Sequence, residues 1–528
     1  MNVRTSRSDV LAKRGIVATS QPLATQAGLE ILRKGGNAID AAVAAAAVLD
    51  VVEPFSTGCG GDAFTLIHLD GKTKPLSYNG SGRSGSLATL QDLLDKGWTE
   101  MPPRGGPPVT VPGALHLWTT VIEKHGALEL KDVLGPAIYY ARNGFPVSPI
   151  IGGYWPFVLS VFQNEEARRV YTINDRAPQV GQTMKNKDLA NVFEKVGKDG
   201  PDVFYTGEIA KSMVDTVQEH GGFLTLDDLE SHKTQQTEAI STNYRGVNVY
   251  EHPPNSQGFA ALSMLNIMER FDFTEFDSLS EERFHIMIEA KKLAYGDLHQ
   301  HCADPSSYKV PLEKLLSKEY AKERAKMISL TSALEDYSSG LSLGSDTVYF
   351  CTADGDGNAV SFINSLYMGI GSGLVAPGTG IKLQNRGHLF SFDPNHPNCY
   401  APNKLPFHTI IPGALYQKNK LWGVFGIMGG AHQAQAHGQF VSHLVDYKMS
   451  PQEAVDFPRF DHDHVTNTVG LEMGIPLYVE GELQKLGHRF DHSETLHYYG
   501  GGQVILRINE DAWIAGSDYR KDGQAAGF

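Results

Sequence analysis

The chain changes character near residue 345, and this change constrains its fold more than any other feature. Up to about residue 330 the hydrophobic pattern is mainly helical, with amphipathic stretches such as Pro22 to Arg33, Leu128 to Arg142 and Glu281 to Leu298. From Thr347 to Phe362, β-branched and aromatic residues alternate around the turn Asp354 to Asn358, which predicts a β-hairpin. Thr409 to Tyr416 is predicted as a further strand. Helices followed by strands favour an α/β (α+β) fold in which helices cover a sheet.

The net charge and the hydrophobic pattern argue against some classes of binding partner and against a membrane span. The 528 residues carry 46 Lys and Arg against 60 Asp and Glu, a formal net charge of −14. This acidic balance argues against a nucleic acid or an anionic membrane surface as the partner. The longest apolar run, Ala38 to Val52, is mostly alanine and contains Asp40 and Asp50. It therefore predicts a buried helix rather than a membrane span.

The cysteines and the N-terminal sequence indicate the cellular compartment of the protein. The four cysteines contain no C-x-x-C pair, so neither a zinc knuckle nor a disulfide framework is indicated, and we expect reduced, mostly buried thiols. No apolar segment of signal-peptide length follows the polar N-terminus, so we expect a cytoplasmic protein.

Three patterns are similar to ligand-binding motifs but depart from them. The loop that begins at Asp354 has the first spacings of a calcium loop, yet Ala359 and Ser365 stand where Gly and Glu are needed. Gly369 to Gly373 lacks the acidic partner of a dinucleotide-binding loop, which favours a flexible turn near the active site. Two histidine groups lack metal-ligand spacing and favour core or solvated histidines, namely His432 with His437, and Asp461 to His464.

The junction before the hairpin holds the residue with the most specific chemistry. A small, polar segment, Ser338 to Ser345, precedes Asp346 and Thr347. A threonine is ordinary at the start of a strand. If the peptide bond between Asp346 and Thr347 were cut, however, the new α-amino group would lie beside the Thr347 hydroxyl. One residue would then supply both the nucleophile and its general base.

At this junction the sequence resembles a known family. The run Asp346 to Ser361, followed by Gly371 to Gly373 and by Gly429-Gly430, is similar to the small subunit of the γ-glutamyltranspeptidases. These are N-terminal-nucleophile amidohydrolases that cut themselves in two. The front half resembles their large subunit at five motifs: Gly35 to Ala42, Thr57 to Asp62, Val111 to Ala114, Gly221-Gly222 and Leu226 to Leu229.

The resemblance implies a fold and a catalytic apparatus. The fold is a four-layer αββα sandwich of the N-terminal-nucleophile hydrolase type, cut between Asp346 and Thr347 into residues 1–346 and 347–528 that interleave in one structural unit. Thr347 is the implied nucleophile, and Ser365 bonds to it where the family usually has a threonine. The N–H groups of Gly429 and Gly430 form the implied oxyanion hole, because glycine permits close backbone approach. No metal or organic cofactor is implied.

The substrate pocket is where the chain departs from the family. The transpeptidases hold the glutamate α-carboxylate with an arginine and a serine pair, and its amino group with an acidic residue. Those positions fall here at Leu87, His408-Thr409 and Leu389, while Tyr367 replaces an asparagine near the nucleophile. Arg386 could still hold a carboxylate through its planar fork, and a surface or structural arginine is the alternative. We therefore expect a small amide substrate that bears an anionic group.

These inferences predict a self-processing N-terminal-threonine amidohydrolase similar to γ-glutamyltransferase or glutathione hydrolase, with an oxamate-like or acylase-like specificity. Its partners would be the amide substrate, its own two fragments and a second copy in a homodimer. Loss of the glutamyl clamp favours hydrolysis, and transfer to an acceptor amine stays open. The alternatives are an unprocessed, non-catalytic homologue that binds a small anion, and a nicotinamide-dependent enzyme, which NAD would stabilise against heat.

Overall fold

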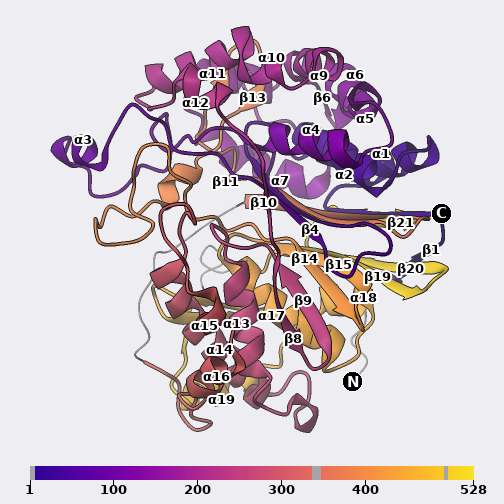
Figure 1. The fold of residues 1–528 in the computed structure, drawn as a ribbon, viewed down its shortest axis with the longest axis vertical. Helices are drawn as coiled ribbons and strands as arrows, with labels where there is room; N and C mark the ends of the chain where they lie inside the picture. Colours follow the sequence, from indigo (N-terminus) through magenta and orange to yellow (C-terminus); the bar gives the residue numbers. More distant parts are fainter. Residues whose placement is uncertain (1–5, 336–345, 493–497) are drawn as a thin grey trace.

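The computed structural model describes residues 6–335, 346–492 and 498–528, and within them two seven-stranded sheets lie between two layers of helices (Figure 1). One sheet has the order β1 (Val10–Ala12), β20 (Ala512–Ser517), β19 (Gly501–Asn509), β15 (Lys420–Met428), β14 (Gly413–Gln417), β9 (Val247–Glu251) and β8 (Ile240–Tyr244). The other has the order β21 (Gln524–Gly527), β2 (Gly15–Thr19), β10 (Asp346–Asp354), β11 (Ala359–Tyr367), β3 (Asp62–His68), β4 (Leu76–Gly80) and β7 (Gln235–Thr237).

The helical layers follow the order of the chain (Figure 1). The layer over the β10 sheet contains α1 (Pro22–Arg33), α2 (Ala38–Val52), α3 (Leu90–Asp95), α4 (Ala114–His125), α5 (Leu130–Val133), α6 (Gly135–Asn143), α7 (Pro149–Leu159), α8 (Glu165–Tyr171), α9 (Lys187–Asp199), α10 (Asp202–Tyr205), α11 (Gly207–Glu219) and α12 (Leu226–Glu230). The layer over the β15 sheet contains α13 (Gly258–Met268), α14 (Glu281–His301), α15 (Leu312–Leu315), α16 (Lys318–Ala325), α17 (His432–Val445), α18 (Pro451–Asp456) and α19 (Leu477–Lys485).

Short elements complete the described chain. They are β5 (Phe145–Pro146), β6 (Thr183–Met184), β12 (Val375–Ala376), β13 (Ile381–Lys382), β16 (Phe460–Asp463), β17 (Thr468–Leu471), β18 (Arg489–Phe490) and the 3₁₀ turns η1 (Phe273–Glu275) and η2 (Arg386–Leu389).

Apolar side chains fill each gap between the layers. One buried cluster joins α2 and its neighbouring helices to the outer face of β10 and β11, and a second joins α13, α14 and α17 to the β15 sheet. A third lies between the sheets, where Phe64 and Tyr349 of one sheet share a cluster with Val424 and Ile505 of the other. Burial on both sides of both sheets explains why the inner strands are apolar on both faces, and it confirms the predicted αββα sandwich.

The predicted alanine-rich helix is α2, and it begins at the predicted residue. Asn37 caps it, because its side chain accepts the N–H groups of Ile39 and Asp40 while the Asp40 side chain accepts the N–H of Asn37. Every residue of α2 is buried. No helix of the described residues is long and apolar enough to cross a membrane.

The predicted hairpin is β10 and β11, which pair antiparallel in the middle of their sheet. Its turn is held by Asp354, whose carboxylate accepts the N–H groups of Asp356 and Asn358 at 3.0 Å. The other carboxylate oxygen accepts the N–H of Ala38 at 2.9 Å, which ties the hairpin to α2. Asp354 therefore works as a structural anchor of the turn.

Two predicted element boundaries are wrong. The stretch Leu128 to Arg142 forms α5 and α6 rather than one helix, and the break falls directly before Gly135-Pro136, where proline disfavours continuation. The strand expected from Thr409 begins at Gly413. Just before it, the N–H of Ile411 bonds the Gln433 side chain of α17 at 3.1 Å instead of a neighbouring strand.

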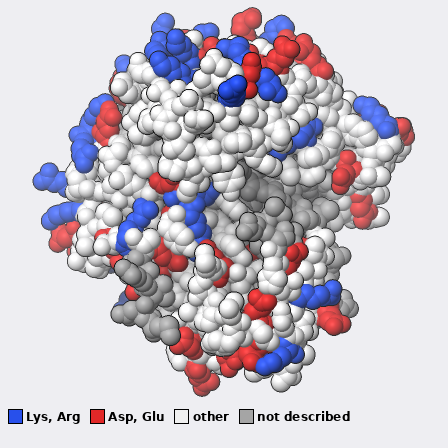
Figure 2. Space-filling model, turned by 180° about the vertical axis from the view of Figure 1, so that it is seen from behind, with Lys and Arg blue, Asp and Glu red and all other residues white. Residues whose placement is uncertain are grey.

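The cysteine thiols are mostly buried, and charges of both signs lie on the face drawn in Figure 2. All four cysteines are free, and Cys399 alone among them is not fully buried. On the face drawn in Figure 2, acidic and basic side chains are interspersed rather than gathered into one patch of a single sign. This face is therefore not built to attract a partner by a field of one sign.

Candidate active site

Thr347 lies at the start of β10, in the centre of its sheet. The pairing of β10 with β11 shifts register between Asp346 and Val348, so Thr347 sits at an irregularity of the ladder. Its side chain is fully buried, and its Oγ1 lies 3.1 Å from the Oγ of Ser365 on β11. The structure therefore brings together the two hydroxyls that the sequence paired.

Ser365 is the centre of a hydrogen-bond network. Its Oγ accepts the N–H of Tyr367 at 2.8 Å and an N–H of the Arg386 guanidinium at 3.0 Å. A hydroxyl has two acceptor positions and one proton, so these two bonds leave its O–H to act as a donor. Ser365 is thus fixed in place beside the Thr347 hydroxyl.

Arg386 is fully buried in the turn η2, so the alternative of a surface arginine is wrong. One terminal nitrogen bonds Ser365 and the other donates to Thr409 Oγ1 at 2.8 Å. The guanidinium lies 4.6 Å from the centre of the Tyr367 ring. Burial lowers the pKa of Arg386 to about 10, with Asp62 acting against that shift, so the side chain keeps its charge at neutral pH.

Tyr367 adopts a left-handed backbone conformation with φ of +80°, which is unusual for an aromatic residue. Burial raises the pKa of its hydroxyl, and that hydroxyl has no hydrogen-bond partner among the described residues. Strained backbone and an unpaired buried polar atom both occur where function outweighs stability. Tyr367 and Arg386 both bond Ser365, and Thr409 bonds Arg386. The substrate-binding role of these residues stays a prediction.

Asp62 is a site residue whose individual role sequence reasoning missed. It starts β3, and its carboxylate accepts from the Gln384 amide at 2.9 Å and from the Gly82 N–H at 3.0 Å. Burial raises the pKa of Asp62 to about 7, against the lowering effect of the Arg386 charge. An acid placed directly after Gly60-Gly61 and before a buried strand was the signal that could have found it.

His408 points at Asp62. Its Nδ1 accepts the N–H of Ile410 at 3.5 Å, so Nε2 carries the proton and donates to Asp62 at 2.9 Å. Burial, with the nearby Arg386 charge, holds the pKa of His408 well below its usual range, so the ring is neutral. His408 therefore fixes the acid that faces Arg386.

Gly429 and Gly430 connect β15 to α17. Their φ angles are +140° and +57°, conformations that favour glycine, and their carbonyls accept the N–H groups of His432 at 3.0 Å and Gln433 at 3.2 Å. The Gln257 amide donates to Gly430 O at 2.7 Å and also to Thr409 O. One connected network therefore links the glycine pair to the nucleophile, in the order Gly430, Gln257, Thr409, Arg386, Ser365, Thr347.

Two histidines of α17, His432 and His437, are part of the core. His432 Nδ1 lies 3.0 Å from Asp461, and His437 Nδ1 lies 2.7 Å from Glu251. Each ring thus pairs with its own carboxylate from another element, which agrees with the core interpretation of these residues. The sequence spacing could not reveal either carboxylate, because both come from distant strands.

Replacing Asp62 by Asn should change how stability depends on pH. The folded pKa of about 7 exceeds the ordinary 3.8, so Asp62 stabilises the fold fully below pH 3.8 and loses this contribution as the pH rises through 7. The free energy of unfolding of Asp62→Asn should therefore rise relative to the parent by roughly 3–4 kcal/mol between pH 4 and pH 8. Urea unfolding in a Thr347→Ala background measures this, with the exposed Asp95→Asn as control. A difference that does not change with pH would contradict the assignment.

Comparisons with known proteins agree with this geometry. The family model described as gamma-glutamyltranspeptidase matches residues 24–528. The chain is 39% identical to the glutathione hydrolase-like YwrD proenzyme of Bacillus subtilis, over 98% of this chain and 99% of that protein. It is 31% identical to the oxamate amidohydrolase proenzyme of Klebsiella pneumoniae, over 99% of this chain and 100% of that protein. The crystal structure of cephalosporin acylase from Bacillus halodurans superposes with a TM-score of 0.93 at 41% identity, covering 100% of this chain and 98% of that one.

Proposed function

The chain belongs to the γ-glutamyltranspeptidase family, and from that premise we propose that it is a self-processing N-terminal-threonine amidohydrolase acting on small, carboxylate-bearing amides. The observation that carries this proposal is the buried Thr347 hydroxyl 3.1 Å from Ser365, at the start of β10. Relatives named as proenzymes, among them a glutathione hydrolase-like protein and an oxamate amidohydrolase, support self-cleavage and amide hydrolysis.

Maturation would use the same hydroxyl as catalysis. Thr347 Oγ attacks the carbonyl carbon of Asp346, the bond from that carbon to the Thr347 nitrogen breaks, and the nitrogen takes the hydroxyl proton. Water then hydrolyses the resulting ester, which frees residues 1–346 and leaves Thr347 with an α-amino group. Ser365, fixed by Arg386 and by the Tyr367 N–H, holds the hydroxyl in place for this step.

Catalysis would follow in two steps. The freed amine accepts the proton of Thr347 Oγ as that oxygen attacks the substrate amide, and it then protonates the leaving amine. The N–H groups of Gly429 and Gly430 stabilise the oxyanion. The hydrogen-bond path from Gly430 O through Gln257, Thr409, Arg386 and Ser365 to Thr347 supports this role. Water hydrolyses the acyl-enzyme.

The charges around Arg386 support an anionic substrate that lacks an α-ammonium group. Asp62, with a pKa of about 7, neutralises Arg386 only in part, so the site keeps positive charge at neutral pH. Leu389, at the position where the family resemblance places an acid, is buried in an apolar cluster with Tyr367. A substrate ammonium would find no carboxylate at Leu389.

Two anilides that differ only in the α-ammonium group test this specificity. We expect the mature enzyme to hydrolyse glutaryl-p-nitroanilide with a kcat/KM at least about tenfold above that for γ-glutamyl-p-nitroanilide, because a desolvated, unpaired ammonium costs more than 1.4 kcal/mol. Leu389→Asp, which restores an acid, should narrow the ratio, and Leu389→Asn is the uncharged control. A preference of the parent enzyme for the γ-glutamyl anilide would contradict the proposed specificity.

A cytoplasmic location and a homodimer also belong to this proposal. The four free cysteines support a reducing compartment. The homodimer stays an expectation.

A further inference from the structure

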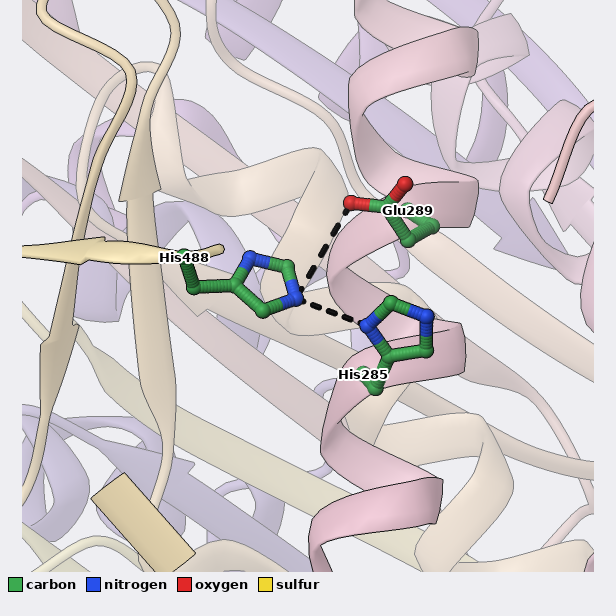
Figure 3. A group of neighbouring side chains, drawn as sticks. All are labelled: His285, Glu289 and His488. Atoms are coloured by element: carbon green, nitrogen blue, oxygen red, sulfur yellow. Dashed lines mark hydrogen bonds and ion pairs between the residues drawn. The ribbon is translucent and has the colours of Figure 1, made fainter. Parts of the chain in front are cut away.

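Three buried side chains outside the active site converge on one point (Figure 3). His285 and Glu289 lie four residues apart on α14, so they share a face of that helix. His488 comes from the segment between α19 and β18. His285 Nδ1 lies 2.8 Å from His488 Nε2, which lies 4.0 Å from Glu289 Oε1. At 4% exposure or less, none of the three is open to solvent.

Contacts behind these side chains orient their ligand atoms toward one another. His285 Nε2 bonds the carbonyl of Ser329 at 2.7 Å, and because a carbonyl only accepts, Nε2 carries the proton and Nδ1 presents its lone pair to the cluster. One oxygen of Glu289 accepts the N–H of Leu334 at 2.7 Å, which leaves Oε1 facing the histidines. Metal-binding histidines and carboxylates are oriented by the same kind of second contact.

We propose that His285, Glu289 and His488 form a binding site for a divalent metal ion of the Zn²⁺ class. Two imidazoles and one carboxylate are a common zinc donor set, and their ligand atoms all lie within 4.8 Å of one another. Without metal, His488 Nε2 donates its proton to His285 Nδ1. His488 Nδ1 has no partner among the described residues and can carry that proton instead, which frees Nε2 for the metal.

Lys292 competes with the metal for the same carboxylate. Its buried ammonium lies 2.8 Å from Glu289 Oε1. It also donates to the carbonyl of Leu334 at 3.0 Å, so it keeps a partner when the metal takes the carboxylate oxygen. The site should therefore bind metal more weakly than the same three ligands would without the lysine.

The position of the site in the chain gives the metal a structural consequence. His285 and Glu289 precede the junction at Asp346 and Thr347, whereas His488 follows it. After the proposed cleavage, a bound ion would join residues 1–346 to residues 347–528. This consequence rests on the proposed function, but metal binding itself does not.

Binding of Zn²⁺ to the uncut Thr347→Ala chain tests the site independently of cleavage. After treatment with EDTA and incubation with ZnCl₂, metal retained through gel filtration should reach one ion per chain by mass spectrometry. His488→Gln and Glu289→Gln, each added to this chain, should lose that ion, and the control His220→Gln should keep it. Co²⁺ should give absorption bands that disappear in the same two variants.

Lys292→Met separates a metal site from a purely structural cluster. Removal of the competing ammonium should tighten Zn²⁺ binding by about tenfold, an effect that a purely structural cluster would not give. The proposal is overturned if the parent chain retains no more Zn²⁺ than His488→Gln, or if Lys292→Met does not bind Zn²⁺ more tightly. In the cleaved wild-type protein, Zn²⁺ should also raise the urea concentration at which the two fragments separate. If Thr347→Ala binds Zn²⁺ while wild-type protein stays uncut, only the proposed function fails.

Discussion

Replacement of Thr347 by Ala should leave the chain uncut and lower amide hydrolysis by about 10⁴-fold or more. The reason is that one hydroxyl serves as the nucleophile of both reactions. The neighbouring hydroxyl of Ser365 is held by Arg386 and by the Tyr367 N–H, so it should not take over that role. The variant should fold normally, since a buried methyl group and backbone pairing are retained.

Thr347→Ser is the matched control for this prediction. Serine keeps both the hydroxyl and, after cleavage, the α-amine, so the chain should still be cut and should keep measurable activity. Rates of self-cleavage and of anilide hydrolysis are measured on the same preparations. An Ala variant that is still cut before residue 347, or that keeps activity within tenfold of the parent, would show that another residue is the nucleophile.

Replacement of Arg386 by Met should lower the free energy of unfolding by about 3–5 kcal/mol. The guanidinium bonds Ser365 and Thr409 inside the protein, and its charge opposes the burial of Asp62. Its loss leaves Asp62 buried without that charge, so the pKa of Asp62 should rise further and the instability should grow toward high pH. Urea unfolding of the uncut chain at two pH values measures both effects.

The same variant should lower kcat as well as raise KM, because Arg386 both fixes Ser365 and supplies positive charge near the substrate. Arg386→Lys keeps the charge without the planar fork. Compared with Arg386→Met, it should have a KM closer to that of the parent enzyme but a kcat that is still low. Arg83→Met is the control, since Arg83 is partly exposed and bonds Asp304. A change in KM alone, with stability and kcat unchanged, would mean that Arg386 only binds substrate.

Sequence predicted the elements whose signals are local. The helix at Ala38 carries its own cap in Asn37, and the hairpin carries its own turn in Asp354 to Asn358, so both were placed well. The two wrong element boundaries arose from a proline in one case and from a side chain distant in the sequence in the other. Gly135-Pro136 divides a stretch that is periodic enough for one helix, and Gln433 of α17 bonds the backbone at Ile411, just before β14 begins.

In the site, too, residues that belong to a motif could be predicted from the sequence, whereas contacts between distant residues could not. Thr347, Ser365 and the glycine pair were predicted because the family motifs name them, and the structure brings the hydroxyls of Thr347 and Ser365 together. The partnership of Asp62 with His408 and Arg386 could not be predicted, because it joins residues more than 300 positions apart. Gln257 was missed because it belongs to no motif and its partners, Gly430 and Thr409, lie more than 150 positions away in the chain.

The denatured mass of the purified protein tests the central claim most directly. We predict two polypeptides, residues 1–346 and 347–528, with Thr347 as the new N-terminus, and a single full-length chain for Thr347→Ala. A wild-type chain that stays intact under conditions in which it folds would contradict self-processing, and it would favour a non-catalytic protein that binds a small anion beside Arg386.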